Sequence, residues 1–416
     1  MTLGSAIGAL NGVAESYVKL VLAMASHDAD YVDAYYGPSQ WRSDIDTAPR
    51  PLDAIQTEAA ALRDALATMP AGVDADPLGA LRHGYLTRQL EALQARVEML
   101  QGRPFTFDQE SMALYDAVAP HGDIASFERA INELGERLPG HGPVVERFDA
   151  FRNQFMIPRE RLDTTFQAAI AGGRDRTRAH IELPPDERFT VEYVTDKSWS
   201  GYNWYQGGYR SLIQVNTDLP IFIDRAIDLA CHEGYPGHHV YNVLLEKHFV
   251  RDRGWIEFSV YALFSPQSLI AEGTANFGID VAFPRDERIE FARRVIFPAA
   301  GLDGARAEEY EDVLALADRL SYAGNEAARR FIDGEIDRET AVSWLERYAL
   351  YSPARARQRV RFVEQYRSYV INYNLGKDMV RRHIEALGGT ASDPARRWQL
   401  FENLLSSPRL PSSLTS

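Results

Sequence analysis

Three of the ten histidines lie within residues 231–239, where the sequence reads Cys-His-Glu-Gly-Tyr-Pro-Gly-His-His. Neutral imidazole is a ligand that suits zinc, and a histidine followed at once by glutamate is how zinc hydrolases present a ligand beside a general base. The carboxylate of Glu233 cannot point at the same spot as His232, so it stays free to take a proton from metal-bound water. The segment therefore predicts a catalytic metal site.

The second histidine ligand is open at this stage. On a regular helix the residue at i+4 returns to the same face, but here that position is Pro236, which cannot bind a metal. His239, at i+7 from His232, returns to the same face of an unbroken helix, whereas His238 does not. Pro236 and the following Gly237 should kink or unwind the helix, and His238 could then reach the metal. Geometry alone leaves both histidines as candidates.

The same residues carry a family resemblance. The string His-Glu-Gly-Tyr-Pro-Gly-His-His resembles the HExxPGH signature of the bacterial domain-of-unknown-function 885 family, whose members are regarded as zinc metallopeptidases related to the thermolysin-like gluzincins. The resemblance favours His238 as the second ligand and leaves His239 to support the ligands or to face the substrate. It covers residues 203–386 and is specific only at the zinc motif.

The resemblance also implies the third ligand. In gluzincins this ligand is a glutamate on a later helix, and residues 271–276 resemble the family's Glu-Gly-Trp segment, with Thr274 where an aromatic residue is usual. Glu272 is therefore expected to complete a Zn²⁺ site with His232 and His238. Nearer the C-terminus, the segment that begins at Tyr373 resembles the family's Tyr-x-x-Gly.

One long basic helix is expected over residues 353–387, and it carries further candidates. Three tyrosines, of which Tyr369 and Tyr373 are the last two, share one of its faces. A tyrosine hydroxyl there could donate to the oxyanion formed when water attacks a carbonyl, and the resemblance singles out Tyr373. Arg381 and Arg382 could fork onto a substrate carboxylate. An aromatic core stripe with solvated arginines is the alternative.

The helix expected to carry Glu272 also holds an acidic residue that could support the metal site and two glycines that could allow close packing. Asp280, eight residues after Glu272, lies close to the same face and could orient a ligand histidine, or it could be a surface carboxylate. Gly273 and Gly278 would allow this helix to approach the zinc helix closely.

Two segments ahead of the zinc motif are expected to be strands. Residues 189–194 and 211–216 alternate and are rich in β-branched or aromatic side chains. Gluzincin-like peptidases usually hold extended peptide against an edge strand before the zinc helix, so residues 211–216 are predicted to do this by backbone pairing. A hairpin that only packs against the helix is the alternative.

Composition limits the partners. The 416 residues carry a formal net charge of −14, which argues against a nucleic-acid partner. The single cysteine, Cys231, excludes an intrachain disulfide and is expected to be a buried residue rather than a nucleophile. Residues 3–25 are apolar, but Glu15 and Lys19 interrupt them, and Val13 and Tyr17 fit a helical stripe. No membrane helix and a cytoplasmic location are therefore predicted.

The expected fold is mainly α, a large helical gluzincin-like body with a small β-sheet or hairpin next to the zinc-binding helix. Residues 1–185 would form a helical cap or bundle, residues 186–405 the catalytic region, and residues 406–416 a disordered tail rich in proline and serine. The sequence says nothing of the oligomeric state.

These features predict a zinc-dependent hydrolase, with a metallopeptidase acting on a peptide or small amide substrate as the first choice. Glu233 would be the general base, and Tyr373 would stabilise the developing oxyanion. A zinc hydrolase of a non-peptide amide or ester would carry the same residues. A non-catalytic helical binding protein with a vestigial metal site is the remaining alternative.

Overall fold

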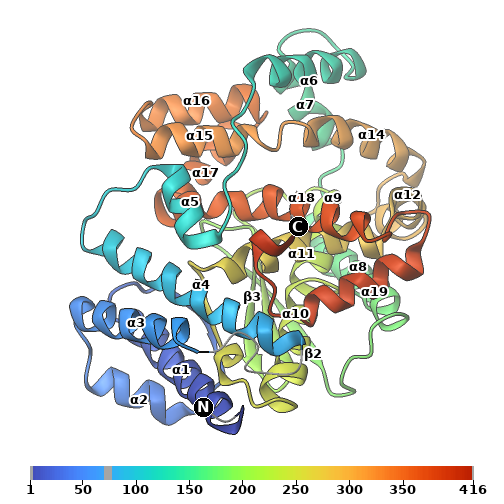
Figure 1. Ribbon diagram of the computed structural model, residues 1–416. Coiled ribbons are helices and arrows are strands. Elements are labelled where there is room, and N and C mark those ends of the chain that lie inside the picture. Colours follow the sequence, from blue (N-terminus) through green and yellow to red (C-terminus); the bar gives the residue numbers. More distant parts are fainter. Residues whose placement is uncertain (1–2, 70–76, 415–416) are drawn as a thin grey trace.

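Helices make up most of the described chain, and two small sheets complete it. The computed structural model describes residues 3–69 and 77–414 (Figure 1). The helices are α1 (Leu3–Met24), α2 (Ser39–Thr47), α3 (Leu52–Ala67), α4 (Pro77–Leu100), α5 (Phe107–Tyr115), α6 (Ile124–Arg137), α7 (Val144–Asn153), α8 (Leu162–Arg178), α9 (Asp224–Leu229), α10 (His238–Leu245), α11 (Pro266–Ala282), α12 (Arg285–Phe291), α13 (Phe297–Ala300), α14 (Ala307–Asp318), α15 (Ala323–Ile332), α16 (Arg338–Tyr348), α17 (Pro353–Tyr366), α18 (Ile371–Ala386) and α19 (Pro394–Leu405). The strands are β1 (Val32–Tyr35), β2 (Arg188–Val194), β3 (Gly201–Gly207), β4 (Arg210–Asn216) and β5 (Val260–Ala262). The prediction of a mainly helical fold is thereby confirmed, with a small sheet just ahead of residues 231–239, which are called the metal-binding segment below.

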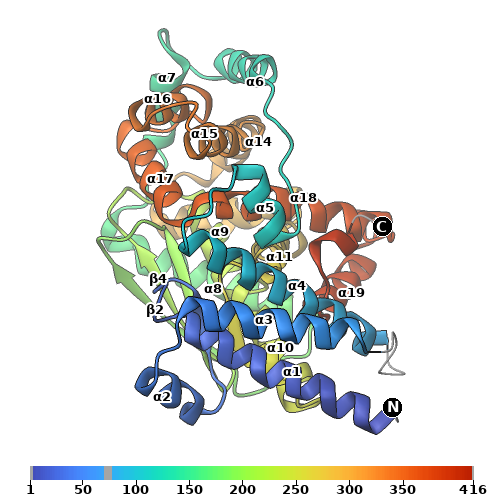
Figure 2. The same cartoon turned by 60° about the vertical axis from the view of Figure 1, so that its left-hand side comes forward.

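Two groups of helices lie at opposite ends of the molecule, with α11 and α18 between them (Figures 1 and 2). Helices α1–α4 form one end. Helices α6 and α7 join α14–α16 at the other end, so segments from both halves of the sequence lie side by side. The halves also share backbone pairing, because β1 pairs with β5 and Met156 bridges to Phe222. The division at residue 185 stays a prediction.

Helix α11 is the central element that carries Glu272. It begins with Pro266 at its first turn, a position where proline costs no hydrogen bond. Nearly all of its residues are buried, which is typical of a helix that is apolar or small on every side. A Cβ on Gly273 would lie 2.6 Å from backbone atoms of Gly376, so this glycine sets the approach of α11 to α18. Gly278 instead lies against Pro236 in the metal-binding segment.

The three-stranded sheet has the order β2-β4-β3, with β4 in the centre. Residues 211–216 pair with β2 in parallel and with β3 in antiparallel fashion, so they have no free edge for a substrate. The prediction that they hold an extended peptide is therefore wrong. Positive φ angles at Gly207, Gly208 and Tyr209 turn the chain sharply and lay β4 along β3. The outer strand β3 is the one that borders the cleft described below.

The single long helix expected over residues 353–387 is divided into α17 and α18. A 3-10 turn, Arg367–Val370, separates them, and Arg367 has a left-handed φ of 51°. The buried carboxylate of Glu110 on α5 stabilises this break by accepting from the Ser368 backbone N–H (3.0 Å), the Ser368 hydroxyl (2.6 Å) and the Arg367 guanidinium (2.6 Å). The break places Tyr369 in the turn rather than on a continuous helical face.

Segments near both ends of the described chain pack against the body. The predicted stripe on α1 is buried, including Val13 and Tyr17. At the other end, residues 411–414 form a short 3-10 helix in which Leu414 is buried, and the backbone N–H of Ser412 donates to Asp116 at 3.0 Å. The disorder expected over residues 406–416 is therefore wrong for residues 406–414, because apolar side chains in this tail find a core to enter. Residues 415 and 416 lie outside the described residues.

Gly273→Ala is expected to lower the free energy of unfolding by roughly 1–3 kcal/mol. The new methyl group would meet backbone atoms, which can yield only if α11 and α18 separate. Gly324→Ala in α15 is the matched control, since nothing lies within 4 Å of its new methyl group. It should leave stability unchanged or raise it by about 0.5–1 kcal/mol. Denaturant unfolding measures both, and equal stabilities would contradict the close helix contact.

Candidate metal centre

The metal-binding segment is a helix that is broken in the middle. Helix α9 continues into a π-helical turn, Ala230–Gly234, and the chain leaves the helix over residues 235–237 before α10 begins at His238. Gly237 crosses this turn so closely that a Cβ there would lie 2.0 Å from the carbonyl oxygen of His232. Pro236 and Gly237 therefore unwind the helix as expected, and His238 is turned back toward His232.

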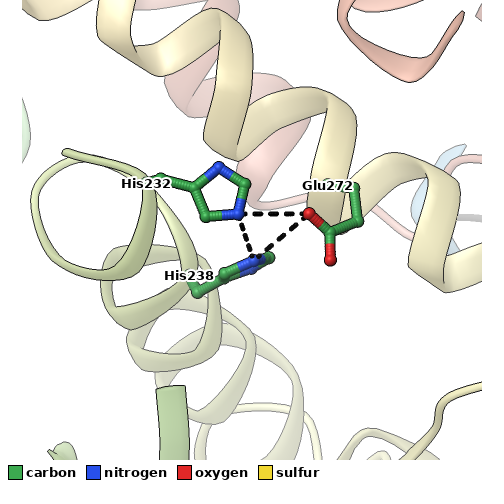
Figure 3. A group of neighbouring side chains, drawn as sticks. All are labelled: His232, His238 and Glu272. Carbon is green, nitrogen blue, oxygen red and sulfur yellow. Dashed lines mark hydrogen bonds and ion pairs between the residues drawn. The ribbon is translucent and has the colours of Figure 1, made fainter. Parts of the chain in front are cut away.

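His232, His238 and Glu272 converge on one point (Figure 3). The Nε2 atoms of the two histidines lie 3.1 Å apart, and Oε2 of Glu272 lies 3.1 Å from His232 and 3.6 Å from His238. The histidines come from the two sides of the helix break, and the glutamate comes from α11. Of the two candidates that the sequence left open, the structure brings His238, not His239, into the group.

A divalent cation fits this group. Oε2 of Glu272 is buried and has no hydrogen-bond partner, and two imidazoles with one carboxylate form a known ligand set of catalytic zinc. Burial lowers the pKa of His238, but the charge of Glu272 more than offsets this and raises the pKa to about 9. Burial likewise opposes charge on Glu272, yet the two imidazoles hold its pKa well below the usual value. The carboxylate therefore draws positive charge to the point that a metal ion would occupy.

The outer atoms of two ligands are held by neighbouring side chains. Tyr369 donates its hydroxyl to Oε1 of Glu272 at 2.7 Å, which leaves Oε2 facing the histidines. Oδ1 of Asn276 lies 3.2 Å from Nδ1 of His232, and its amide donates to the backbone oxygen of Tyr373 at 3.1 Å. A contact at Nδ1 fixes which ring nitrogen is available to a metal. Asn276, one turn after Glu272, takes the orienting role that the sequence suggested for Asp280.

His239 lies behind the metal centre and does not reach it. Its ring is fully buried, with Nδ1 2.8 Å from the hydroxyl of Ser211 and Nε2 2.9 Å from Glu187. Glu187 also accepts from Tyr235 and Arg178. Burial disfavours the charged form of Glu187 and so raises its pKa, but these hydrogen bonds outweigh burial and lower the pKa to about 2. The network anchors the metal-binding segment to the sheet, and Glu187 carried no signal in the sequence because its partners are distant.

Glu233 is buried beside the metal group with little room around it. Burial raises the pKa of its carboxyl group, although the two imidazoles oppose this. Its Oε1 would lie only 2.8 Å from a Cβ on Gly201 of β3, so a larger residue there would displace the carboxylate. Asn203, two residues further along the strand, donates to the backbone oxygen of Glu233 at 2.7 Å. Strand β3 therefore holds this glutamate in place.

Asp33 is a site residue that the sequence analysis missed. It lies on β1, lines the same cleft, and accepts a hydrogen bond from Tyr202. Burial raises the pKa of Asp33 to about 6 against the effect of the Tyr202 hydrogen bond and of the charge on His238. It reaches the centre only because β1 pairs with β5, and a four-residue strand in the N-terminal half gives no local signal of this.

The other predicted residues differ in whether they reach the centre. Tyr373 does: its ring stacks on His232 with centroids 6.4 Å apart, and burial holds the pKa of its hydroxyl well above the usual value. Asp280 forms ion pairs with Arg288 at 3.2 Å and Lys377 at 2.9 Å and touches no ligand histidine.

The two arginines predicted to bind a substrate carboxylate are engaged by one residue of their own helix. Arg381 pairs with the carboxylate of Asp378, and Arg382 donates to the backbone oxygen of Asp378 at 3.1 Å. Arg381 lines the cleft, while Arg382 is exposed.

The metal group opens into a cleft of about 1020 Å³, lined by β3 and by helices that include α7, α9, α11, α14, α17 and α18. This volume is at the upper end of the range usual for ligand sites and is sufficient for a short peptide. Aromatic rings and charged groups both line it, among them Trp199, Tyr202, Phe362 and Arg359.

Comparison with known proteins shows the fold but no family. No family model matches the chain, and no curated protein matches it. A solved structure from Colwellia psychrerythraea, described as a "putative lipoprotein", is 14% identical with a TM-score of 0.53, over 89% of this chain and 70% of that chain. A "putative lipoprotein of unknown function" from Shewanella oneidensis is 13% identical with a TM-score of 0.50, over 90% and 74%. At these identities the likeness shows a shared fold alone.

The prediction of a cytoplasmic location is wrong. The proteins that share the fold are described as lipoproteins. In addition, α1 contains a stretch, Ile7–Met24, that is long and apolar enough to cross a membrane and is consistent with a signal sequence. Glu15 and Lys19 pair with each other at 2.6 Å one helical turn apart, so they interrupt the apolar stretch less than two unpaired charges would.

Zinc binding should depend on His232, His238 and Glu272 but not on His239. Replacing any of the three with alanine is expected to abolish stoichiometric zinc binding, because each supplies one ligand atom. His239→Gln should retain the metal, since its ring points toward Glu187. Elemental analysis after dialysis against zinc, with circular dichroism as a check of folding, gives the measurement. A folded His239→Gln protein that has lost its zinc would refute the assignment.

Glu187→Gln tests the network behind the centre through its pH dependence. Because the folded pKa is depressed from 4.5 to about 2, the charge on Glu187 stabilises the fold above pH 4.5, and this is lost as pH falls toward 2. At pH 6 the free energy of unfolding of the variant should be about 3 kcal/mol lower than that of the wild-type protein, and the difference should shrink on acidification. Glu182→Gln is an exposed control nearby. A difference that does not change with pH would rule out the assigned charge.

Proposed function

We propose that the protein is a zinc-dependent hydrolase, and specifically a metallopeptidase of the kind represented by the domain-of-unknown-function 885 family. The observation that carries this is the free carboxylate of Glu233 beside the His232–His238–Glu272 group, inside a cleft large enough for a peptide. A purely structural metal site would have no use for an additional carboxylate or an open cleft.

A zinc ion held by the three ligands would act as a Lewis acid and lower the pKa of a water molecule toward about 7. Glu233 takes the proton of the attacking water and later returns it to the leaving amine of the scissile bond. Burial favours the first of these steps, because a carboxyl group with a raised pKa binds the proton more readily than an exposed one.

Tyr373 stabilises the negative charge that develops on the carbonyl oxygen. Its hydroxyl stays protonated because burial raises its pKa, so it can donate a hydrogen bond throughout the reaction. Its ring lies against His232, which places the side chain next to the reacting bond. Strand β3 replaces β4 as the strand that pairs with an extended substrate, since it is an outer strand of the sheet and its residues 201–203 line the cleft.

Glu233→Gln and Tyr373→Phe should lower kcat on mixed short peptides while leaving zinc content unchanged. The expected losses are about 10²- to 10⁴-fold for the general base and about 10²- to 10³-fold for the oxyanion donor. Liquid chromatography with mass spectrometry of the digests provides the measurement. The strand-β2 variants Glu192→Gln and Tyr193→Phe change exposed residues in the same ways and serve as controls.

Two results would count against the proposal. Zinc-loaded wild-type protein that cleaves no peptide bond would exclude a metallopeptidase, and the same substrates presented as esters or non-peptide amides would then test the broader hydrolase class. Full activity in the zinc-loaded Glu233→Gln protein would remove the general base from the reaction.

A further inference from the structure

One face of α17 presents two arginines and two aromatic side chains to the cleft. Arg355, Arg359, Phe362 and Tyr366 follow one another at spacings of four, three and four residues, which aligns them along one side of a helix. All four line the cleft, while Arg357 on the same helix is exposed.

Neither of these two arginines has a carboxylate partner within the described part of the chain. Arg359 forms no ion pair there, and its Nε is buried without a hydrogen-bond partner. Its guanidinium lies over Phe362 at 4.9 Å and over Tyr373 at 5.6 Å. Arg355 lies 4.5 Å above the ring of Tyr351. Stacking fixes the plane of a guanidinium but leaves its donors available.

The acidic groups nearby form no ion pair with either arginine in the described chain. Asp224 accepts from Tyr310 at 2.5 Å and from Arg152 at 3.5 Å, and Asp228 accepts from Arg225 at 3.3 Å. Asp149 lines the same cleft without an ion pair to Arg355. Asp224 and Asp149 interact with Arg355 only through their charge, so within the described residues the donors of both arginines are left without a carboxylate acceptor.

The behaviour of neighbouring groups supports this excess of positive charge. Burial lowers the pKa of Arg355, and the nearby guanidiniums of Arg152 and Arg225 lower it further, against the opposing effect of Tyr351 and Asp224. Burial alone would raise the pKa of the Tyr351 hydroxyl, yet Arg355 and Arg359 together hold it below its usual value. An anion at this wall would relieve the repulsion among the arginines.

The position of the arginines relative to the metal group defines which part of a substrate they meet. The ring of Tyr373 stacks on His232, with centroids 6.4 Å apart, and the guanidinium of Arg359 lies 5.6 Å from the centre of the same ring. A peptide whose scissile carbonyl lies at the metal group would reach Arg359 with the portion just beyond the cleaved bond. The charge best suited to a forked guanidinium is a carboxylate.

We propose that Arg359, assisted by Arg355, binds the C-terminal carboxylate of the substrate, so that the protein acts on short peptides and releases their C-terminal residue or residues. This rests on the proposed hydrolase function for the location of the scissile bond. It transfers the role of carboxylate binding from Arg381 and Arg382, which Asp378 engages, to a pair of arginines that form no ion pair with an acidic residue of the described chain.

Binding measured without turnover tests this proposal separately from hydrolysis. The zinc-loaded Glu233→Gln protein is titrated by calorimetry with the peptide Ala-Ala-Ala and with its C-terminal amide. The free acid should bind about 10- to 100-fold more tightly, because a hydrogen-bonded charge pair distinguishes the two peptides. Adding Arg359→Gln should remove this preference, Arg359→Lys should restore only part of it, and the exposed control Arg357→Gln should leave it intact.

Three results would overturn the proposal. The acid and the amide could bind equally, or the preference could survive in the Arg359→Gln protein. The Arg359→Gln change could also weaken acid and amide alike, which would assign Arg359 to a substrate carbonyl instead. A third peptide, Ala-Ala-Glu with a C-terminal amide, identifies the source of the carboxylate: binding as tight as that of the free acid would assign the site to an acidic side chain. Peptide binding without hydrolysis by the wild-type protein would count against the proposed function alone.

Discussion

The centre depends on keeping the carboxylate of Glu272 charged inside the protein. A buried carboxylate without partners would take up a proton or unfold its surroundings. Here the two imidazoles supply positive charge on one oxygen, and Tyr369 donates to the other. This arrangement requires α11 to approach α18 closely, which the contact between Gly273 and Gly376 permits. The helix packing and the ligand geometry are therefore one constraint.

Other buried glutamates are likewise kept charged by hydrogen bonds and ion pairs, and through these they hold segments of the structure together. Glu187 anchors the metal-binding segment through Tyr235 and His239, and Glu110 holds the turn that carries Tyr369. In a third case, Arg82 of α4 and Glu257 form a bidentate pair, at 2.5 and 3.0 Å, that is almost wholly buried. Each pairing joins segments that are distant in the sequence. Because breaking one partner leaves an uncompensated charge, such pairs specify one arrangement of these segments.

The sequence predicted those parts of the site that depend on local chemistry. The break at Pro236 and Gly237 follows from the fixed φ and missing N–H of proline and from the conformational freedom of glycine. It places His238 in the metal group. The family resemblance supplied Glu272, which no spacing rule would have given. Burial of the small-residue helix α11 also follows from its composition.

Tertiary pairing explains what the sequence did not predict. Asp33 enters the cleft through a strand pairing, and Arg359 differs from the exposed Arg357 only in which side of α17 faces inward. The positive φ of Arg367 is stabilised by a hydrogen bond to Glu110, which lies 257 residues earlier in the chain. Strand β4 was expected at an edge because its second neighbour, β3, was not among the strands that the sequence predicted. Local patterns carry no information about such partners.

The net charge of the chain does not describe the charge of the cleft. The chain carries a formal charge of −14, yet one wall of the cleft holds arginines without acidic partners. At physiological ionic strength, charges on the surface are screened over about 8 Å, whereas charges in a partly buried cleft are screened much less. A ligand in the cleft therefore responds to Arg355, Arg359 and Asp33 rather than to the acidic exterior. Opposite charges at separate places in one cleft suit a substrate that itself carries both signs, as a short peptide with free ends does.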